Sequence, residues 1–314
     1  MIYKKLGNTN LIVSRLGLGT AEIGFKYGIK KTNLPSEKEA IQLLKTAVDL
    51  GITFFDTANF YGLSEERLGK SGISKMDNII IATKCGHFLE KGEDFSGTDL
   101  ENKLRDEIKN SLKVLKLDFL PLVQLHGGNK ENIEKGELIE VFKKFKKEGL
   151  IKYTGISVRG EESAIAAIES NFFDTVQVAY SIIDQRMKKN ALPLAKEKNI
   201  GIINRSVLLK GSLTRAASLL PESLSPLKEA SNKSNLIAQK LNIDLPTLAI
   251  RFALSEDAIT TSLIGTNKIE NLKKVCSAID AGPLPKDVVK ELNELALSEE
   301  KYVDPAKWPQ IKIN

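Results

Sequence analysis

Four polar side chains of different chemistry follow apolar, strand-like segments in the first half of the sequence. Together they offer a carboxylate, a phenol, an ammonium and an imidazole, a set that can protonate a carbonyl oxygen while hydride reaches the carbonyl carbon. Because no protein side chain donates a hydride, this chemistry requires a bound nicotinamide. The four residues are Asp56 in FFDTANFYG, Tyr61 five residues later, Lys84 in IIIATKCG and His126 in LPLVQLHGG.

The segments that carry these residues belong to a regular alternation of short β-branched runs and longer amphipathic stretches. Such an alternation is typical of βα units and a parallel sheet. A hairpin around residues 7–10 is expected before the first strand. The eight expected strands span residues 16–19, 53–56, 79–84, 119–125, 153–157, 175–178, 201–205 and 261–264.

Eight strands, each followed by a helix, close most naturally into a (β/α)8 TIM barrel. The predicted fold class is therefore α/β, with an N-terminal β-hairpin cap and a C-terminal helix plus tail. A length of 314 residues suits one large barrel, and no linker interrupts the pattern, so residues 1–314 are expected to form a single domain. The least regular segments are 127–136, 206–232 and 298–314.

In such a barrel the carboxyl ends of all strands meet on one face, so residues far apart in sequence can converge there. Asp56, Lys84 and His126 close the second, third and fourth expected strands, and Tyr61 lies in the loop after Asp56. Taken singly, these residues could form a structural ion pair, pack a loop or satisfy a backbone group. A lysine or aspartate buried at a strand end needs partners, however, so their joint placement favours an active site.

The roles of the four residues follow from their acidity. A free tyrosine, with a pKa of about 10, is a poor acid at neutral pH, and an adjacent ammonium lowers that pKa. We therefore expect Lys84 to lower the pKa of Tyr61, and Asp56 to keep Lys84 charged and oriented. His126 is expected to hydrogen-bond the substrate oxygen and to share its proton.

These residues and the segments around them resemble the aldo-keto reductase family along nearly the whole chain. The resemblance implies an NAD(P)-dependent oxidoreductase that interconverts a carbonyl (aldehyde, ketone or sugar) and an alcohol, with Asp56, Tyr61, Lys84 and His126 as its tetrad. The segments that carry it are LGLGTAEIG, GITFFDTANFYGLSEERLGK, ATKCG, LVQLHGG, KYTGISV, VQVAYSIID, RSVLLKGSL and SLIGTNKIENL.

The same resemblance implies a dinucleotide site made of three groups. In the first group, two residues hold the nicotinamide carboxamide and a third stacks on the nicotinamide ring. The second group is a loop that binds phosphate, and the third is a later segment that binds the adenosine end. In that order the groups are Ser157, Gln177 and Arg205; Ser206, Leu208 and Gly211; and Gly265, Thr266, Asn267, Lys268, Glu270 and Asn271.

The chain departs from the family pattern at several cofactor positions. Val158 replaces an asparagine, Arg205 an aromatic ring and Val207 a proline. Asn267 stands where many NADPH-preferring members have an arginine, but Lys268 could meet a 2'-phosphate. NADPH is therefore the expected cofactor, with NAD possible.

These departures also leave a second function open, a cofactor-sensing regulatory or binding protein of the same fold, as potassium-channel β-subunits of this family are. A third hypothesis is a metal-dependent hydrolase whose metal is held by Cys85, His87, His126 and Asp56, but a total of two histidines argues against a metal. Cys85 is interpreted as an apolar filler and His87 as a loop residue near the substrate entrance. Trp308 could anchor the tail or line the substrate pocket.

Two other phosphate-binding motifs are incomplete in this sequence. Glu22 occupies the third glycine position of a GxGxxG fingerprint that begins at Gly17. The Gly69-Lys70-Ser71 triplet lacks the first glycine of a Walker loop, and SEERLGK is interpreted as a helix start.

Composition limits the partners and the compartment. The net charge of +6 comes from 46 basic residues spread among 40 acidic ones, and aromatic residues make up only 6%, so nucleic-acid binding is not expected. The basic run between residues 143 and 147 is interpreted as the polar face of an amphipathic helix. Two distant cysteines, no signal peptide and no apolar span favour a cytoplasmic protein without a membrane partner. A small-molecule carbonyl or sugar substrate is expected, and a monomer is favoured.

Overall fold

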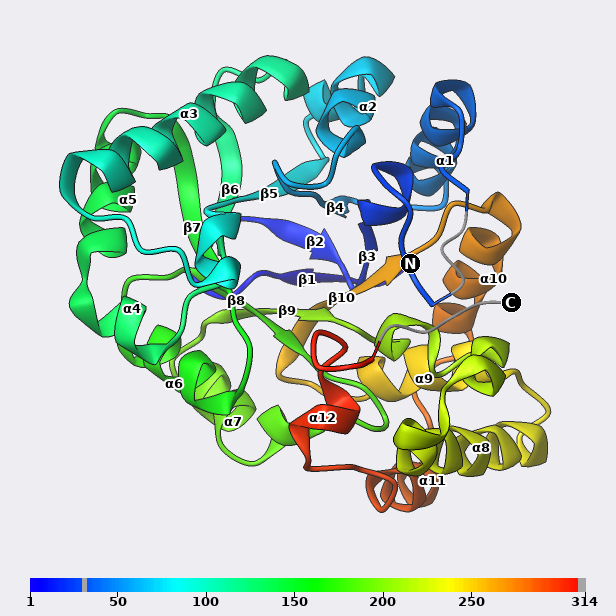
Figure 1. Cartoon of the computed structure of the whole chain (residues 1–314). Coiled ribbons are helices and arrows are strands. Elements are labelled where there is room, and N and C mark those ends of the chain that lie inside the picture. Colours follow the sequence, from blue (N-terminus) through cyan, green and yellow to red (C-terminus); the bar gives the residue numbers. More distant parts are fainter. Residues whose placement is uncertain (30–32, 310–314) are drawn as a thin grey trace.

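The computed structural model describes residues 1–29 and 33–309, and at its centre lies a closed barrel with helices around it (Figure 1). The strands pair in parallel in the order β10-β3-β4-β5-β6-β7-β8-β9. The predicted barrel is confirmed, and every expected strand is found within two residues of its predicted bounds. The strands are β3 (Leu16–Gly19), β4 (Phe54–Asp56), β5 (Ile80–Cys85), β6 (Leu120–His126), β7 (Ile151–Ser157), β8 (Thr175–Ala179), β9 (Gly201–Arg205) and β10 (Ile259–Gly265).

The expected hairpin closes the amino end of the barrel. Its strands β1 (Tyr3–Lys5) and β2 (Ile12–Ser14) are antiparallel, and Leu6 and Val13 are fully buried in one cluster with apolar residues of the barrel strands. Gly7 has a φ of +55°, and a Cβ atom there would lie 2.2 Å from the backbone nitrogen of Gly201. Only glycine lets the hairpin approach β9 this closely. The opposite, carboxyl end of the barrel is thus left for a site.

The helices form the outer layer of the molecule around the barrel (Figure 1). Their buried apolar residues belong to one core cluster with those of the barrel strands. The basic segment between residues 143 and 147 lies in α5, where Phe142 and Phe145 are buried, so the amphipathic helix is confirmed. SEERLGK forms α2, as predicted. The helices are α1 (Glu37–Asp49), α2 (Ser64–Ser71), α3 (Gly97–Leu115), α4 (Lys130–Lys135), α5 (Glu137–Lys147), α6 (Glu161–Glu169), α7 (Ala191–Glu197), α8 (Ser225–Lys240), α9 (Leu245–Leu254), α10 (Ile269–Asp280), α11 (Lys286–Asn293) and α12 (Glu300–Val303).

The three irregular segments contain more helix than their sequences indicate. Segment 127–136 contains α4, and segment 206–232 contains three short 3-10 turns and the beginning of α8. After β10 and the barrel helix α10, the chain forms the C-terminal helix α11 and then the tail, as predicted; the tail contains the short α12, and its residues 310–314 lie outside the described residues. In the described part of the chain, no helix combines the length and the apolar character needed to cross a membrane.

Candidate active site

Three of the four expected tetrad residues meet at the carboxyl face of the barrel. Asp56 ends β4, Lys84 is the penultimate residue of β5, and Tyr61 lies in the loop that follows β4. The Lys84 Nζ donates to Asp56 Oδ2 at 2.5 Å and to the Thr57 carbonyl at 3.0 Å, and it lies 3.5 Å from the Tyr61 hydroxyl. The lysine side chain is 1% exposed, so its charge depends on these oxygen partners.

His126, the fourth residue, ends β6 and packs edge-on against Tyr61 with 5.6 Å between ring centroids. Its Nδ1 is buried and has no hydrogen-bond partner in the described structure. Burial first, and then the nearby cation Lys84, lower the pKa of His126 to about 2. The ring is therefore neutral. It can donate one hydrogen bond to a substrate oxygen, and the low pKa disfavours the imidazolium form of this ring; that His126 shares the proton of the substrate oxygen stays a prediction.

The low pKa of His126 predicts how stability depends on pH. In the unfolded chain the His126 imidazole binds a proton below about pH 6.5, whereas in the folded chain it does so only near pH 2. The free energy of unfolding therefore falls as the pH drops between these two values, by up to about 1.4 kcal/mol per pH unit. We expect His126→Gln to lose less stability between pH 7 and pH 5 than the parent protein, measured by urea unfolding at both values. Equal losses would show that the histidine does not contribute.

The pKa of Tyr61 is raised rather than lowered, which corrects the prediction from the sequence. Burial of the phenol is the largest cause and the Asp56 carboxylate the next, while Arg205 and Arg159 oppose them only in part. The ammonium of Lys84 is already neutralised by Asp56 at 2.5 Å. In the free protein Tyr61 is consequently a neutral phenol, a proton donor and not a phenolate.

Two glutamines hold Asp56 in place. Asp56 Oδ1 accepts from Gln124 Nε2 at 3.0 Å and from Gln177 Nε2 at 2.8 Å, and Ser157 Oγ lies 3.4 Å from Gln177 Oε1. Sequence reasoning missed Gln124. The available signal was a polar residue two positions before His126 on the same strand face, within an otherwise apolar run. Ser157 and Gln177 lie together as expected, although the Gln177 amide nitrogen is directed at Asp56.

Aromatic rings surround the tetrad at the mouth of the barrel. His87 stacks on Phe60 with 3.5 Å between ring centroids, and its centroid lies 4.8 Å from that of His126, so it lies beside the tetrad; that it borders the substrate entrance stays a prediction. Phe25 contacts both Tyr27 and Tyr61 at 5.8 Å. Sequence reasoning missed Phe25, Tyr27 and Phe60, since only the fold brings the loops after β3 and β4 together. A flat or apolar substrate surface would find ring faces here.

The ends of β7, β8 and β9 place the first group of expected cofactor residues beside the tetrad. Arg205 ends β9, and its Nη2 donates to the Val158 carbonyl at 3.0 Å while its Nη1 lies 3.4 Å from Ser206 Oγ. The loop after β9 turns tightly. Ser206 has a φ of 63° and Gly211 one of 105°, and the Leu208 carbonyl accepts from the Gly211 nitrogen at 2.8 Å. Left-handed backbone at a non-glycine residue is strained and is common in ligand-binding loops.

The last group lies between β10 and α10. Thr266 is buried, and its Oγ1 accepts from the Lys268 backbone nitrogen at 3.1 Å and from Asn271 Nδ2 at 3.4 Å. The Asn267 side chain donates to the Asn33 carbonyl at 3.1 Å. Gly265, Lys268, Glu270 and Asn271 are exposed around the beginning of α10. This turn therefore offers polar side chains and a helix N-terminus to solvent next to β9.

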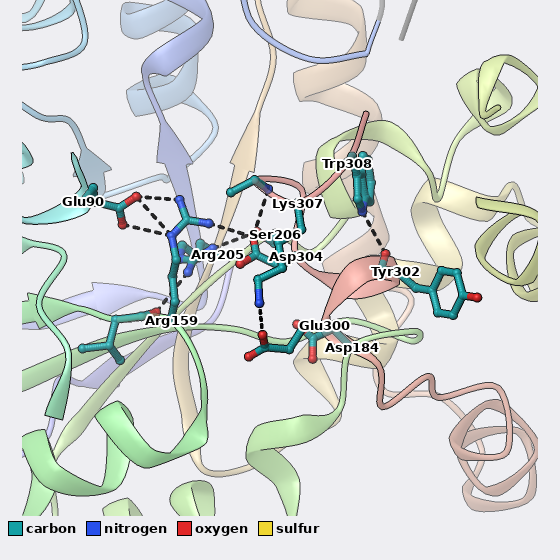
Figure 2. A network of polar contacts seen from close by, with 12 residues as sticks. Glu90, Arg159, Asp184, Arg205, Ser206, Glu300, Tyr302, Asp304, Lys307 and Trp308 are labelled. Atoms are coloured by element: carbon teal, nitrogen blue, oxygen red, sulfur yellow. Dashed lines mark hydrogen bonds and ion pairs between the residues drawn. The ribbon is translucent and has the colours of Figure 1, made fainter. Parts of the chain in front are cut away.

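Arg159 ties the C-terminal tail across the barrel mouth (Figure 2). From the loop after β7, its Nη2 pairs with Glu90 Oε2 at 2.6 Å and its Nη1 with Asp304 Oδ1 at 2.7 Å. Glu90 follows β5 and Asp304 follows α12, so one guanidinium joins two distant segments. Trp308 packs on the apolar core and donates from Nε1 to the Tyr302 carbonyl at 3.0 Å, which makes it an anchor of the tail.

Removing the Arg159 guanidinium is expected to loosen the tail. In Arg159→Met the buried parts of Glu90 and Asp304 lose their shared cation, and we expect limited trypsin digestion to cut after Lys307 several times faster than in the parent protein. Mass spectrometry of the fragments measures this rate. Lys143→Met, which removes an exposed pair with Glu140, serves as the control. An unchanged cleavage rate would show that the tail is held by its apolar contacts alone.

The described residues contain no group of three His, Cys, Asp or Glu side chains placed to hold a metal ion. Cys85, in β5, is buried among apolar residues, as the sequence indicates, and burial raises the pKa of its thiol well above the ordinary value.

A closed parallel barrel with a cluster of titratable side chains at the carboxyl ends of its strands has the architecture of a TIM-barrel enzyme. The family described as "Aldo/keto reductase family" matches residues 15–297. The chain belongs to this family.

Similar proteins cover the chain almost completely. It is 29% identical over 307 residues to the uncharacterized oxidoreductase YqkF of Bacillus subtilis, covering 93% of this chain and 95% of that protein. It is 29% identical over 329 residues to L-galactose dehydrogenase of Arabidopsis thaliana, covering 98% and 96%. The solved holo form of an aldo-keto reductase from Bacillus halodurans superposes with a TM-score of 0.78 at 28% identity, covering 97% of this chain and 100% of the other. The chain is thus a carbonyl/alcohol oxidoreductase.

Proposed function

We propose that the protein is an NAD(P)-dependent oxidoreductase in which Tyr61 exchanges a proton with the substrate oxygen. The observation that carries this proposal is the buried Lys84 ammonium, which lies 2.5 Å from Asp56 Oδ2 and 3.5 Å from the Tyr61 hydroxyl. Such an ammonium can stabilise the phenolate that remains after the phenol has given up its proton. A purely structural ion pair would not require a phenol beside it.

The proposed roles of the chain's own residues follow from this geometry. Tyr61 donates its proton to the carbonyl oxygen, and Lys84 stabilises the resulting charge. Asp56, fixed by Gln124 and Gln177, keeps Lys84 protonated despite its burial. His126, neutral, donates a hydrogen bond that directs the oxygen. A bound nicotinamide supplies the hydride.

The proposed cofactor site extends from the tetrad to the beginning of α10. Its residues fit a dinucleotide because Ser157, Gln177 and Arg205 offer polar groups at the tetrad's side of the barrel, and both a strained loop after β9 and an exposed polar turn after the neighbouring strand β10 lie beyond them. We propose NADPH over NADH, with Lys268 near the 2'-phosphate. Calorimetric titration with NADPH and NADH tests the preference, and tighter binding of NADH would contradict it.

The proposed substrate is a small aldehyde, ketone or sugar. The similarity to L-galactose dehydrogenase supports the sugar, and the aromatic rings at the mouth support a substrate with an apolar face. The direct test is to follow cofactor absorbance at neutral pH with NADPH and a panel of carbonyls, and with NADP+ or NAD+ and aldoses. Turnover of at least one substrate is expected. The absence of both turnover and cofactor binding would contradict the proposed function.

A cofactor-sensing regulatory protein is the second candidate function. It is supported by the Gln177 amide, whose nitrogen contacts Asp56, and by Val158 in place of an asparagine. Such a protein would bind cofactor and show no turnover, and Tyr61→Phe would leave its partner interaction unchanged. In either case we propose a monomeric cytoplasmic protein with residues 1–314 in one domain.

A further inference from the structure

Arg205 is a half-buried cation beside the tetrad whose hydrogen-bond partners are all neutral. They are the Val158 carbonyl at 3.0 Å and the Ser206 hydroxyl at 3.4 Å. Within residues 1–29 and 33–309, no carboxylate forms an ion pair with this guanidinium. Two nearby cations differ from it, because Lys84 pairs with Asp56. Arg159 pairs with both Glu90 and Asp304 (Figure 2).

The charge of Arg205 reaches the reacting position. Of the cations that act on Tyr61, Arg205 lowers the pKa of the phenol most, ahead of Arg159, and its effect also exceeds the opposite effect of Glu90. It lowers the pKa values of Lys84 and His126 as well. A carbonyl oxygen that accepts a proton from Tyr61 would therefore lie in the positive potential of Arg205, and so would a hydride donor in contact with that carbonyl carbon.

The two forms of a nicotinamide differ in charge at this position. Reduction of the substrate moves one hydride, with its electron pair, from the dihydronicotinamide ring to the carbonyl carbon, and one proton from Tyr61 to the oxygen. The substrate is reduced to the alcohol and the neutral dihydronicotinamide is oxidised to a pyridinium cation. A nearby guanidinium without a carboxylate partner disfavours the pyridinium and leaves the neutral ring unaffected.

We propose that Arg205 makes the site select reduced over oxidised nicotinamide, and that the protein is thereby set up as a carbonyl reductase. The inference rests on the proposed function, in which the nicotinamide ring lies beside Arg205. A site with this selectivity fills with reduced cofactor even where the oxidised form is equally abundant, and it releases the oxidised product readily. The oxidation of an aldose would be disfavoured at this site, because that reaction begins with the oxidised, cationic form of the cofactor bound.

Calorimetry on the purified full chain tests the inference by measuring Kd for NADPH and NADP+ at pH 7. The parent protein is expected to bind NADPH at least about tenfold more tightly than NADP+, because two unit charges a few ångströms apart in a partly buried site change an equilibrium constant by that much or more. Arg205→Met and Arg205→Gln are expected to bring the ratio of the two Kd values close to one. Arg205→Lys, which keeps the charge, is expected to keep most of the selectivity.

Each other outcome has a defined meaning. Equal weakening of both forms in Arg205→Met, with the ratio unchanged, would show that Arg205 anchors a phosphate or the Val158 loop, and would overturn the inference. Equal binding of both forms by the parent protein would overturn it without any variant, so a variant that fails to fold leaves the test intact. No binding of either form by the folded parent protein would instead remove the proposed function.

Discussion

Tyr61→Phe is expected to lower kcat for carbonyl reduction by roughly a thousandfold, the range over which a positioned general acid contributes. The substitution removes one oxygen atom and keeps the ring that packs against Phe25 and His126. Tyr61 is a neutral phenol in the free protein, so the substitution removes the proton donor that lies 3.5 Å from Lys84 Nζ. Initial rates from cofactor absorbance, at saturating cofactor, measure the effect.

Two controls make the result specific to the hydroxyl. The Kd of the Tyr61→Phe variant for NADPH is expected to match that of the parent protein, since Tyr61 is not among the residues proposed to bind the cofactor. Tyr27→Phe removes another phenol of the mouth, one that contacts Phe25 and makes no hydrogen bond with Lys84, and a change of less than about threefold is expected. A tenfold or smaller loss in Tyr61→Phe would assign the proton donor to a different group.

The fold follows from the sequence because a parallel barrel has a repeating signature. Each buried strand is a short β-branched run, and each is followed by an amphipathic stretch, so the number and positions of the strands can be read locally. Helix α1 illustrates the precision available: Ser36 and Glu39 form a capping box that fixes its first residue, Glu37. Once the barrel is accepted, its geometry brings Asp56, Lys84 and His126 to one face without further information.

The contacts between loops could not be predicted in the same way. Arg159 meets Glu90 across 69 positions of sequence and Asp304 across 145, and no local pattern joins these residues. The ring contacts of Phe25, Phe60 and His87 likewise depend on how loops after different strands fold over the mouth. Such contacts come from tertiary packing, which the spacing of residues in sequence does not encode.

The pKa of Tyr61 shows why burial has to be known before acidity can be inferred. The prediction from the sequence considered the ammonium of Lys84, which lowers the pKa of a nearby phenol. The structure adds the loss of solvent around the phenol and an Asp56 carboxylate that both neutralises the ammonium and disfavours the phenolate. The sign of the shift is therefore decided by terms that only the three-dimensional structure provides.

Lys84→Met is expected to reduce both the stability and the activity of the protein. The methionine fills the space of the lysine stem but leaves the Asp56 carboxylate, 4% exposed, without its cation. Breaking one side of a buried ion pair typically costs about 3–5 kcal/mol of unfolding free energy. Hydrogen bonds from Gln124 and Gln177 to the same carboxylate oxygen should place the loss at the lower end of that range. Urea unfolding at pH 7 measures it.

The matched variant is the double change Asp56→Asn with Lys84→Met. It removes both charges and keeps shapes close to the originals, so it should recover much of the stability that Lys84→Met loses, because a neutral pair in a buried site carries no desolvation cost for charge. Activity should not recover, since the ammonium that stabilises the Tyr61 phenolate is absent in both proteins. If the double variant regains stability and also turns over substrate, Lys84 is a structural partner of Asp56 alone. If it regains neither, the loss in Lys84→Met comes from packing rather than from the unpaired carboxylate.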